Sequence, residues 1–182
     1  MLGRRRRRLA LVLAAVLLAA PAVALAASRL TVARYAAPDA TVFKVTADRS
    51  LTAKGLASFA LRITPPAGAT GPYGATEHVT TADLPRAGTN VPLRVGSALA
   101  CADPGVSTAY GTVIRRAKRV TATLQDGTRL RLSRTEPPAA WGLHGWVVAG
   151  IANSHSPVVE VDASDTHGKR VAYAKFQNVS GC

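Results

Sequence analysis

Short stretches in which apolar and polar residues alternate recur along most of this 182-residue chain, and glycine, proline and other turn residues separate them. Side chains of a β-strand point alternately to the two faces of a sheet, so a two-residue period is typical of half-buried strands. Many short strands divided by turn signals favour a sandwich or a partly open barrel. We expect strands at residues 41–46, 59–63, 77–80, 91–95, 108–114, 120–124, 130–133, 146–151, 158–162 and 170–176.

The pattern on both sides of Asp126-Gly127 predicts a β-hairpin with a defined register. A two-residue turn there would leave neither face of the hairpin apolar. A three-residue loop over 125–127 puts Ala122 opposite Leu130 and gathers the apolar side chains on one face. Gly127 then takes the left-handed position of a type I turn with a G1 bulge, where glycine costs least.

Three other segments have distinct patterns. Residues 146–151 lack polar alternation, which predicts a strand buried on both faces. One helix is expected at 50–61, although Gly55 weakens its helix propensity. Residues 64–74 contain three prolines and three glycines and predict a loop or linker.

The first 26 residues have the layout of a secretory signal peptide. Five arginines at 4–8 precede an apolar stretch at 9–20, and small residues follow in Ala24-Leu25-Ala26. We expect cleavage after Ala26, with Ala27 as the second choice, and a protein that is secreted or held in the cell envelope. The alternative is an uncleaved membrane anchor, since residues 9–27 carry no charge. No later stretch is long and apolar enough to span a membrane.

The expected fold class is all-β, an antiparallel β-sandwich preceded by the cleaved leader. We divide the chain into the signal peptide at 1–26, a β-rich part at 27–100 whose autonomy is open, and a sandwich-like part at 101–182. The strand pattern of the last part is similar to immunoglobulin-like modules in a generic way. It lacks the Cys…Trp…Cys spacing of true immunoglobulin domains.

The two cysteines are Cys101 and Cys182, the last residue. An even number of cysteines in an exported chain predicts a disulfide. That bond would hold the C-terminus against the rest of the last part. The alternatives are two free thiols or an intermolecular bond through Cys182. A metal site is not expected, because no histidine lies at ligand spacing from either cysteine.

The mature part of the chain is strongly basic. Five of the 23 Lys and Arg residues lie in the leader, so 18 remain against 10 Asp and Glu, a formal charge of +8. This excess favours anionic partners, among them cell-wall polyphosphates, acidic lipids, extracellular DNA and polyanionic sugars. The candidate anion-binding residues are Arg115, Arg116, Lys118, Arg119, Arg129, Arg131 and Arg134. The alternative is a solvated sheet face whose charges prevent edge-to-edge pairing.

Residues 141–146, with two tryptophans, are the densest aromatic segment, and no aromatic residues are interleaved with the basic residues. We therefore expect no sequence-specific recognition of nucleic acid. Trp146 is expected to fill the core and Trp141 to cover one end of the sandwich. The functional alternative is a loop that contacts a sugar or a lipid.

No catalytic constellation stands out. The histidines are His78, His144, His155 and His167. Ser154-His155-Ser156, with Asp162 or Asp165 nearby, supplies the residue types of a serine hydrolase, but no nucleophile-elbow motif surrounds the serines. Neither a phosphate-binding glycine loop nor a dinucleotide fingerprint occurs, and we expect no cofactor, no metal and no catalytic residue.

The sequence therefore favours an exported, non-enzymatic β-sandwich protein whose basic face binds a polyanion. Its partner would be an anionic polymer of the cell envelope or another envelope protein. One alternative is a small secreted hydrolase with a His/Asp/Ser site. Another is an extracytoplasmic protein-interaction or accessory domain.

Overall fold

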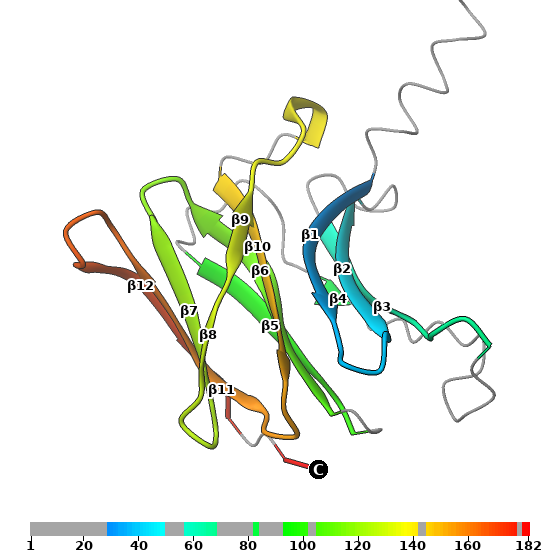
Figure 1. Cartoon of the computed structure of the whole chain (residues 1–182). Helices are drawn as coiled ribbons and strands as arrows, with labels where there is room; N and C mark the ends of the chain where they lie inside the picture. The colour runs from blue at the N-terminus through cyan, green and yellow to red at the C-terminus, as the bar shows by residue number, and fades with distance from the viewer. Residues whose placement is uncertain are drawn as a thin grey trace, which may run out of the picture.

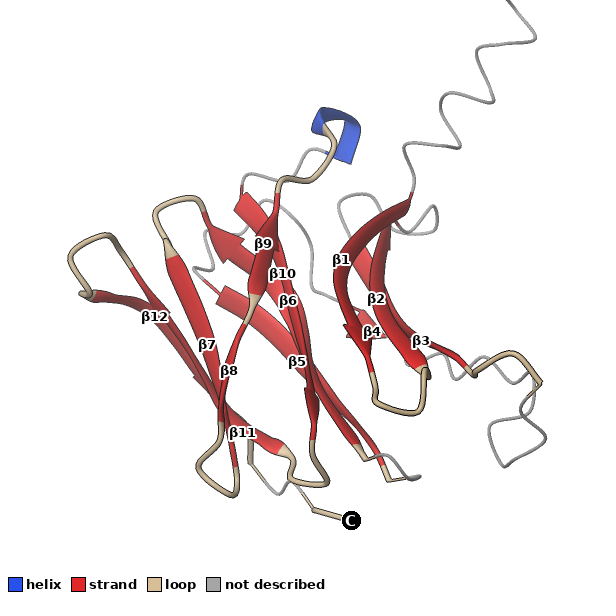
Figure 2. Ribbon diagram, in the orientation of Figure 1, coloured by secondary structure: helices blue, strands red, loops and turns tan. Residues whose placement is uncertain are grey.

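Figure 1 shows the computed structural model of the chain, which describes residues 29–49, 57–68, 82–83, 93–101, 105–141, 145–177 and 180–182. The predicted leader, the strand expected at 77–80, and His78 and His144 lie outside these residues. The described part consists of β-strands and one short 3-10 helix, η1 (Ala139–Trp141). All strand pairs are antiparallel, which confirms the all-β expectation (Figure 2). Within that part, no helix is long and apolar enough to cross a membrane.

The strands form three four-stranded sheets. Sheet A contains, in spatial order, β1 (Arg29–Ala36), β2 (Val42–Arg49), β3 (Ala57–Thr64) and β4 (Ala82–Asp83). Sheet B contains β5 (Leu93–Ala100), β6 (Val106–Ile114), β10 (Gly145–Asn153) and β9 (Ser133–Thr135). Sheet C contains β12 (Arg170–Lys175), β11 (Val158–Ser164), β7 (Arg119–Leu124) and β8 (Arg129–Arg131).

Sheet B is the middle layer, between sheets A and C (Figure 1). A first core joins it to sheet A, where Phe43 and Val147 pack in the same cluster. A second core joins it to sheet C, with Val148 and Val161 in one cluster. Val147, Val148 and Ala149 have no exposed surface, so the prediction of a strand buried on both faces is confirmed for β10. Successive residues of β10 serve opposite cores because their side chains alternate across the sheet.

The stretch from β8 to β9 closes one side of the space between sheets B and C. β8 pairs with β7 in sheet C, and β9 pairs with β10 in sheet B. Leu132 lies between them, is buried, and donates its N–H to the carbonyl of Val120. Close approach of the two sheets here depends on Gly150, because a Cβ on it would lie 3.1 Å from Leu130.

The predicted hairpin register is confirmed. Ala122 lies opposite Leu130, and the N–H of Leu124 donates to the carbonyl of Thr128 at 2.9 Å. Gly127 has a φ of 85°, the left-handed conformation that the three-residue loop requires. The alternation of apolar residues was enough to predict the register, because only the bulged register puts these residues on one face of the hairpin.

The prediction of a helix at 50–61 is wrong for residues 57–61, which form the first part of β3. Residues 50–56 are outside the described part. Phe59 and Leu61 alternate into the first core, and β3 pairs with β2 along its whole length. This tertiary pairing overrides the weak helix propensity of the segment. Strand β1 was not predicted, because a register shift between Thr31 and Ala33 interrupts its alternation.

The disulfide between Cys101 and Cys182 is present, with 5.5 Å between the two Cα atoms. Cys101 follows β5 directly, and the chain reaches Cys182 after β12. β5 and β12 are outer strands of sheets B and C. The bond therefore fastens the two sheets on the side opposite β8 and β9.

Candidate anion-binding surface

The outer face of sheet C carries polar side chains in ordered rows. Alternate residues of its four strands point away from the second core, because Val120, Ala122 and Val161 occupy the inward positions. The register aligns the outward positions across the sheet. One row contains Arg131, Thr121, Asp162 and Tyr173, and the next contains Arg129, Thr123, Glu160 and Lys175.

The two acidic residues of this face are engaged by β12. Asp162 forms an ion pair with Arg170, and Tyr173 donates its hydroxyl hydrogen bond to Glu160 at 3.2 Å. The guanidinium of Arg170 lies 4.8 Å from the centre of the Tyr173 ring. Partial burial, and then the hydrogen bond to Glu160, raise the pKa of Tyr173. The alternation of residues 158–162 places both acids on one side of the strand, but their partners on β12 are not evident from the sequence.

The other half of the face carries exposed arginines. Arg129 lies opposite Thr123, Arg131 lies opposite Thr121, and Arg119 lies two residues before Thr121 on β7. Within the described part of the chain, none of these three arginines forms an ion pair with an acid. We call Arg119, Arg129 and Arg131 the arginine strip.

The remaining predicted cations are engaged within the protein, apart from Lys118, which is exposed next to Arg119. Arg115 pairs with Glu136 at 2.7 Å, and Arg116 lies 3.5 Å from Asp165. Arg134 donates to the carbonyl of Ala117 at 2.8 Å. The seven predicted residues thus divide into an arginine strip with Lys118 beside it and a second group with intramolecular partners.

Two arginines of the second group meet at Trp146. The guanidinium groups of Arg115 and Arg134 lie 5.7 Å and 5.3 Å from the centre of its ring. The indole N–H donates to the carbonyl of Arg115 at 3.2 Å. Cation–π contacts of this kind hold long arginine side chains in place.

The two tryptophans exchange the roles expected from the sequence. Trp141 is buried in the first core, whereas Trp146 is half-buried at the margin of the second. Trp146 is the second residue of β10 and lies next to the β6–β7 turn, so its ring contacts that turn instead of the middle of the core. The expectation that Trp146 fills the core and Trp141 covers an end is therefore wrong.

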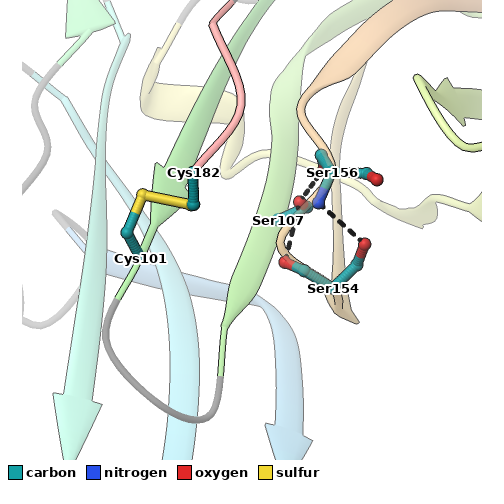
Figure 3. The surroundings of a disulfide bond; sticks show 5 residues. All are labelled: Cys101, Ser107, Ser154, Ser156 and Cys182. Atoms are coloured by element: carbon teal, nitrogen blue, oxygen red, sulfur yellow. Dashed lines mark hydrogen bonds between the residues drawn. A yellow bond between two sulfur atoms is a disulfide. The ribbon is translucent and has the colours of Figure 1, made fainter.

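Ser154, His155 and Ser156 lie at the opposite end of sheet C from the β6–β7 turn, whereas His167 lies in the turn that follows β11. Ser107 donates to the carbonyls of Ser154 and Ser156, beside the disulfide (Figure 3). His155 packs flat on Gly105, where an added Cβ would lie 2.3 Å from its Nδ1 atom. Ser154 donates to Asp126, 3.4 Å from its Oδ2 atom.

The carboxylates proposed to complete a catalytic triad lie elsewhere. His155 precedes β11 and Asp165 follows it, so seven strand residues, about 23 Å, separate them. Asp162 points to the outer face, where Arg170 binds it. Asp165 accepts hydrogen bonds from the N–H groups of His167 and Lys169 in the next turn. The structure does not bring these residues together as a triad.

Among the described residues, no group of three or more His, Cys, Asp or Glu side chains could hold a metal ion. The comparisons with protein families, curated proteins and solved structures find no match to the chain.

Proposed function

We propose that this chain is an exported, non-enzymatic β-sandwich protein that binds an anionic polymer of the cell envelope through the arginine strip. One observation carries the proposal: three exposed arginines share one sheet face, and the acids of that face are engaged by other residues. The formal charge of +8 on the mature chain adds a long-range attraction to anions.

The arrangement of the strip suits an anionic ligand. Guanidinium groups bind phosphate or sulfate oxygens bidentately. Arg119 and Arg131 are diagonal neighbours on adjacent strands, where like charges repel. A bound anion would relieve this repulsion, so binding and the stability of the sheet would reinforce each other.

Export is supported by two independent features. The first 26 residues have the composition of a signal peptide. The Cys101–Cys182 disulfide fits an oxidising compartment outside the cytoplasm. In this proposal sheets B and C form the sandwich, similar to immunoglobulin-like modules only in a generic sense, and its exposed face meets the envelope.

The test is a titration of the purified protein with long-chain inorganic polyphosphate at several salt concentrations. We expect the logarithm of the binding constant to fall linearly with the logarithm of the salt concentration, because each arginine in contact releases counterions. The variant R129Q/R131Q should bind more weakly and with a shallower slope.

The matched control is R34Q/K44Q. Arg34 and Lys44 are neighbouring cations on adjacent strands of sheet A. The control removes the same charge without touching the strip, so it should change binding much less. Binding that is indifferent to salt, or equally weakened by both double variants, would refute the role of the strip.

A further inference from the structure

The arginine strip contains a structural repeat. Arg129 pairs with Thr123 and Arg131 pairs with Thr121, so the same two-residue unit occurs twice on one face. Cross-strand partners have Cβ atoms about 5 Å apart, so an arginine and its threonine can contact one ligand group. The two units are two residues apart along the strands, a spacing of about 7 Å.

The threonines of the repeat are available to a ligand. Thr121 and Thr123 are partly exposed, and among the described residues their hydroxyl groups form no hydrogen bond within the protein. Each hydroxyl can donate one hydrogen bond to an anion oxygen. Each unit therefore offers a guanidinium fork and a hydroxyl donor, the combination that suits a phosphate group.

The charged residues around the arginine strip favour one orientation of a bound polyanion. β11 is the second strand from β8 across the sheet, about 10 Å away, and its residues Glu160 and Asp162 face outward. A polyanion laid across the strands would meet these carboxylates. A polyanion laid along β8 meets Arg129, then Arg131, and then Arg119 with Lys118 beyond it. The favourable path is parallel to the strands.

A small anion fits this surface poorly. The three arginines are exposed on a sheet face, whereas small-ligand sites are usually concave and bury most of the ligand. A single phosphate bound at one unit leaves the other unit, about 7 Å away, without a phosphate of its own. A chain of repeated phosphate groups can place one of its phosphates on each unit.

A lipid surface is also disfavoured. Among the described residues the exposed large apolar side chain is Tyr173, which lies on β12, three strands from Arg131. Peripheral membrane binding normally combines basic residues with apolar side chains that enter the interface. The neighbours of the strip are threonines, which supply hydrogen bonds instead.

We infer that the arginine strip binds one extended chain of repeating phosphate groups, laid parallel to β8, with Arg129–Thr123 and Arg131–Thr121 as successive subsites. This inference rests on the proposed function and names its ligand class and binding mode. It makes ligand length and the threonine hydroxyls, besides total charge, determinants of affinity.

The first experiment compares three probes at fixed ionic strength: linear polyphosphates of increasing length, inositol hexakisphosphate as a compact polyanion, and vesicles rich in anionic lipid. We expect affinity per phosphate to rise with chain length until the chain spans the strip, and the compact probe to bind at least tenfold more weakly than a linear chain of equal charge. Equal affinity for linear and compact probes, or preference for vesicles, would overturn the inference while leaving polyanion binding intact. Failure of all three probes to bind would refute the proposed function itself.

The second experiment uses T121V/T123V, which removes two hydroxyls and keeps the size and strand propensity of the side chains. We expect about tenfold weaker binding of a long polyphosphate, from the loss of two hydrogen bonds, with an unchanged salt slope. The control T31V/T64V changes two exposed threonines of sheet A and should bind normally. If T121V/T123V also binds normally, the threonines are not part of the subsites and the inference fails.

Discussion

The N–H of Leu132 donates to the carbonyl of Val120 at 2.9 Å, at the point where the chain passes from sheet C to sheet B. The arginine strip lies just before this crossing, and Arg134, which contacts Trp146, lies just after it. Leu132, through this hydrogen bond and its buried side chain, therefore holds the segment that joins the arginine strip to Arg134. We therefore expect the stability of sheet C to depend on this crossing.

Replacement of Leu132 by alanine tests that dependence. Leu132 is 3% exposed, and a buried leucine-to-alanine change costs about 2–5 kcal/mol through lost burial and the cavity that remains. We expect L132A to lower the free energy of unfolding by an amount in this range, measured by urea denaturation. Leu130 is only half-buried, so L130A should cost less. Equal losses would contradict the special position of Leu132.

Removal of the disulfide tests how the two outer strands are held. The bond joins residues 81 positions apart, and the loop-entropy model assigns it about 4.5 kcal/mol of stabilisation. We expect C101S/C182S to unfold at a clearly lower temperature than the oxidised protein. Reduction of the unmodified protein should produce a similar shift, which separates the loss of the bond from any effect of the serines. An unchanged midpoint in both cases would show that β5 and β12 hold together without it.

Local sequence patterns predicted those features whose cause is local. The register of the 125–127 hairpin follows from alternation and one glycine, and the burial of β10 follows from a run of apolar residues. The disulfide follows from the number of cysteines. For the hairpin and for β10, the short-range pattern admits one arrangement that buries the apolar side chains.

Features that depend on distant partners were not predictable in the same way. The segment at 57–61 overlaps both the predicted helix at 50–61 and the predicted strand at 59–63, and it is the pairing with β2 that makes it a strand. Trp141 lies in the core because sheet A supplies a second layer against sheet B. Arg115 and Arg116 form ion pairs with Glu136 and Asp165, which are distant in the sequence, so sequence alone could not separate the unpaired arginines from the paired ones.

Three hairpin turns share one backbone geometry, and Ala40 occupies the position that glycine takes in the other two. Ala40 has a φ of 68°, against 85° for Gly127 and 76° for Gly168. A left-handed conformation costs an L-residue about 1–2 kcal/mol, and glycine avoids this at a smaller entropic cost. We expect A40G to raise the free energy of unfolding by about 0.5–1 kcal/mol, and G127A or G168A to lower it by a similar amount. A destabilising A40G would show that the turn at Ala40 is not strained.

Two of these turns also carry an aspartate whose ionised form is stabilised. The carboxylate of Asp39 accepts a hydrogen bond from the N–H of Thr41 at 3.0 Å, and that of Asp126 accepts one from the N–H of Thr128 at 2.8 Å. These backbone donors, followed by the threonine hydroxyls, lower the pKa of both aspartates. Their contribution to stability is complete above the unfolded-state pKa of about 3.9 and is lost as the pH falls through the lower folded-state values.

The free energy that the two aspartates contribute to folding should therefore be constant above about pH 5 and should decrease below about pH 4. The variant D39N/D126N removes both titrating groups and keeps an amide oxygen that can accept the same backbone hydrogen bonds. We expect it to be less stable than the unmodified protein at pH 7 and to lose less stability between pH 4 and pH 2, measured as urea midpoints. Parallel losses in the two proteins over that interval would mean that the turn aspartates do not contribute to acid sensitivity.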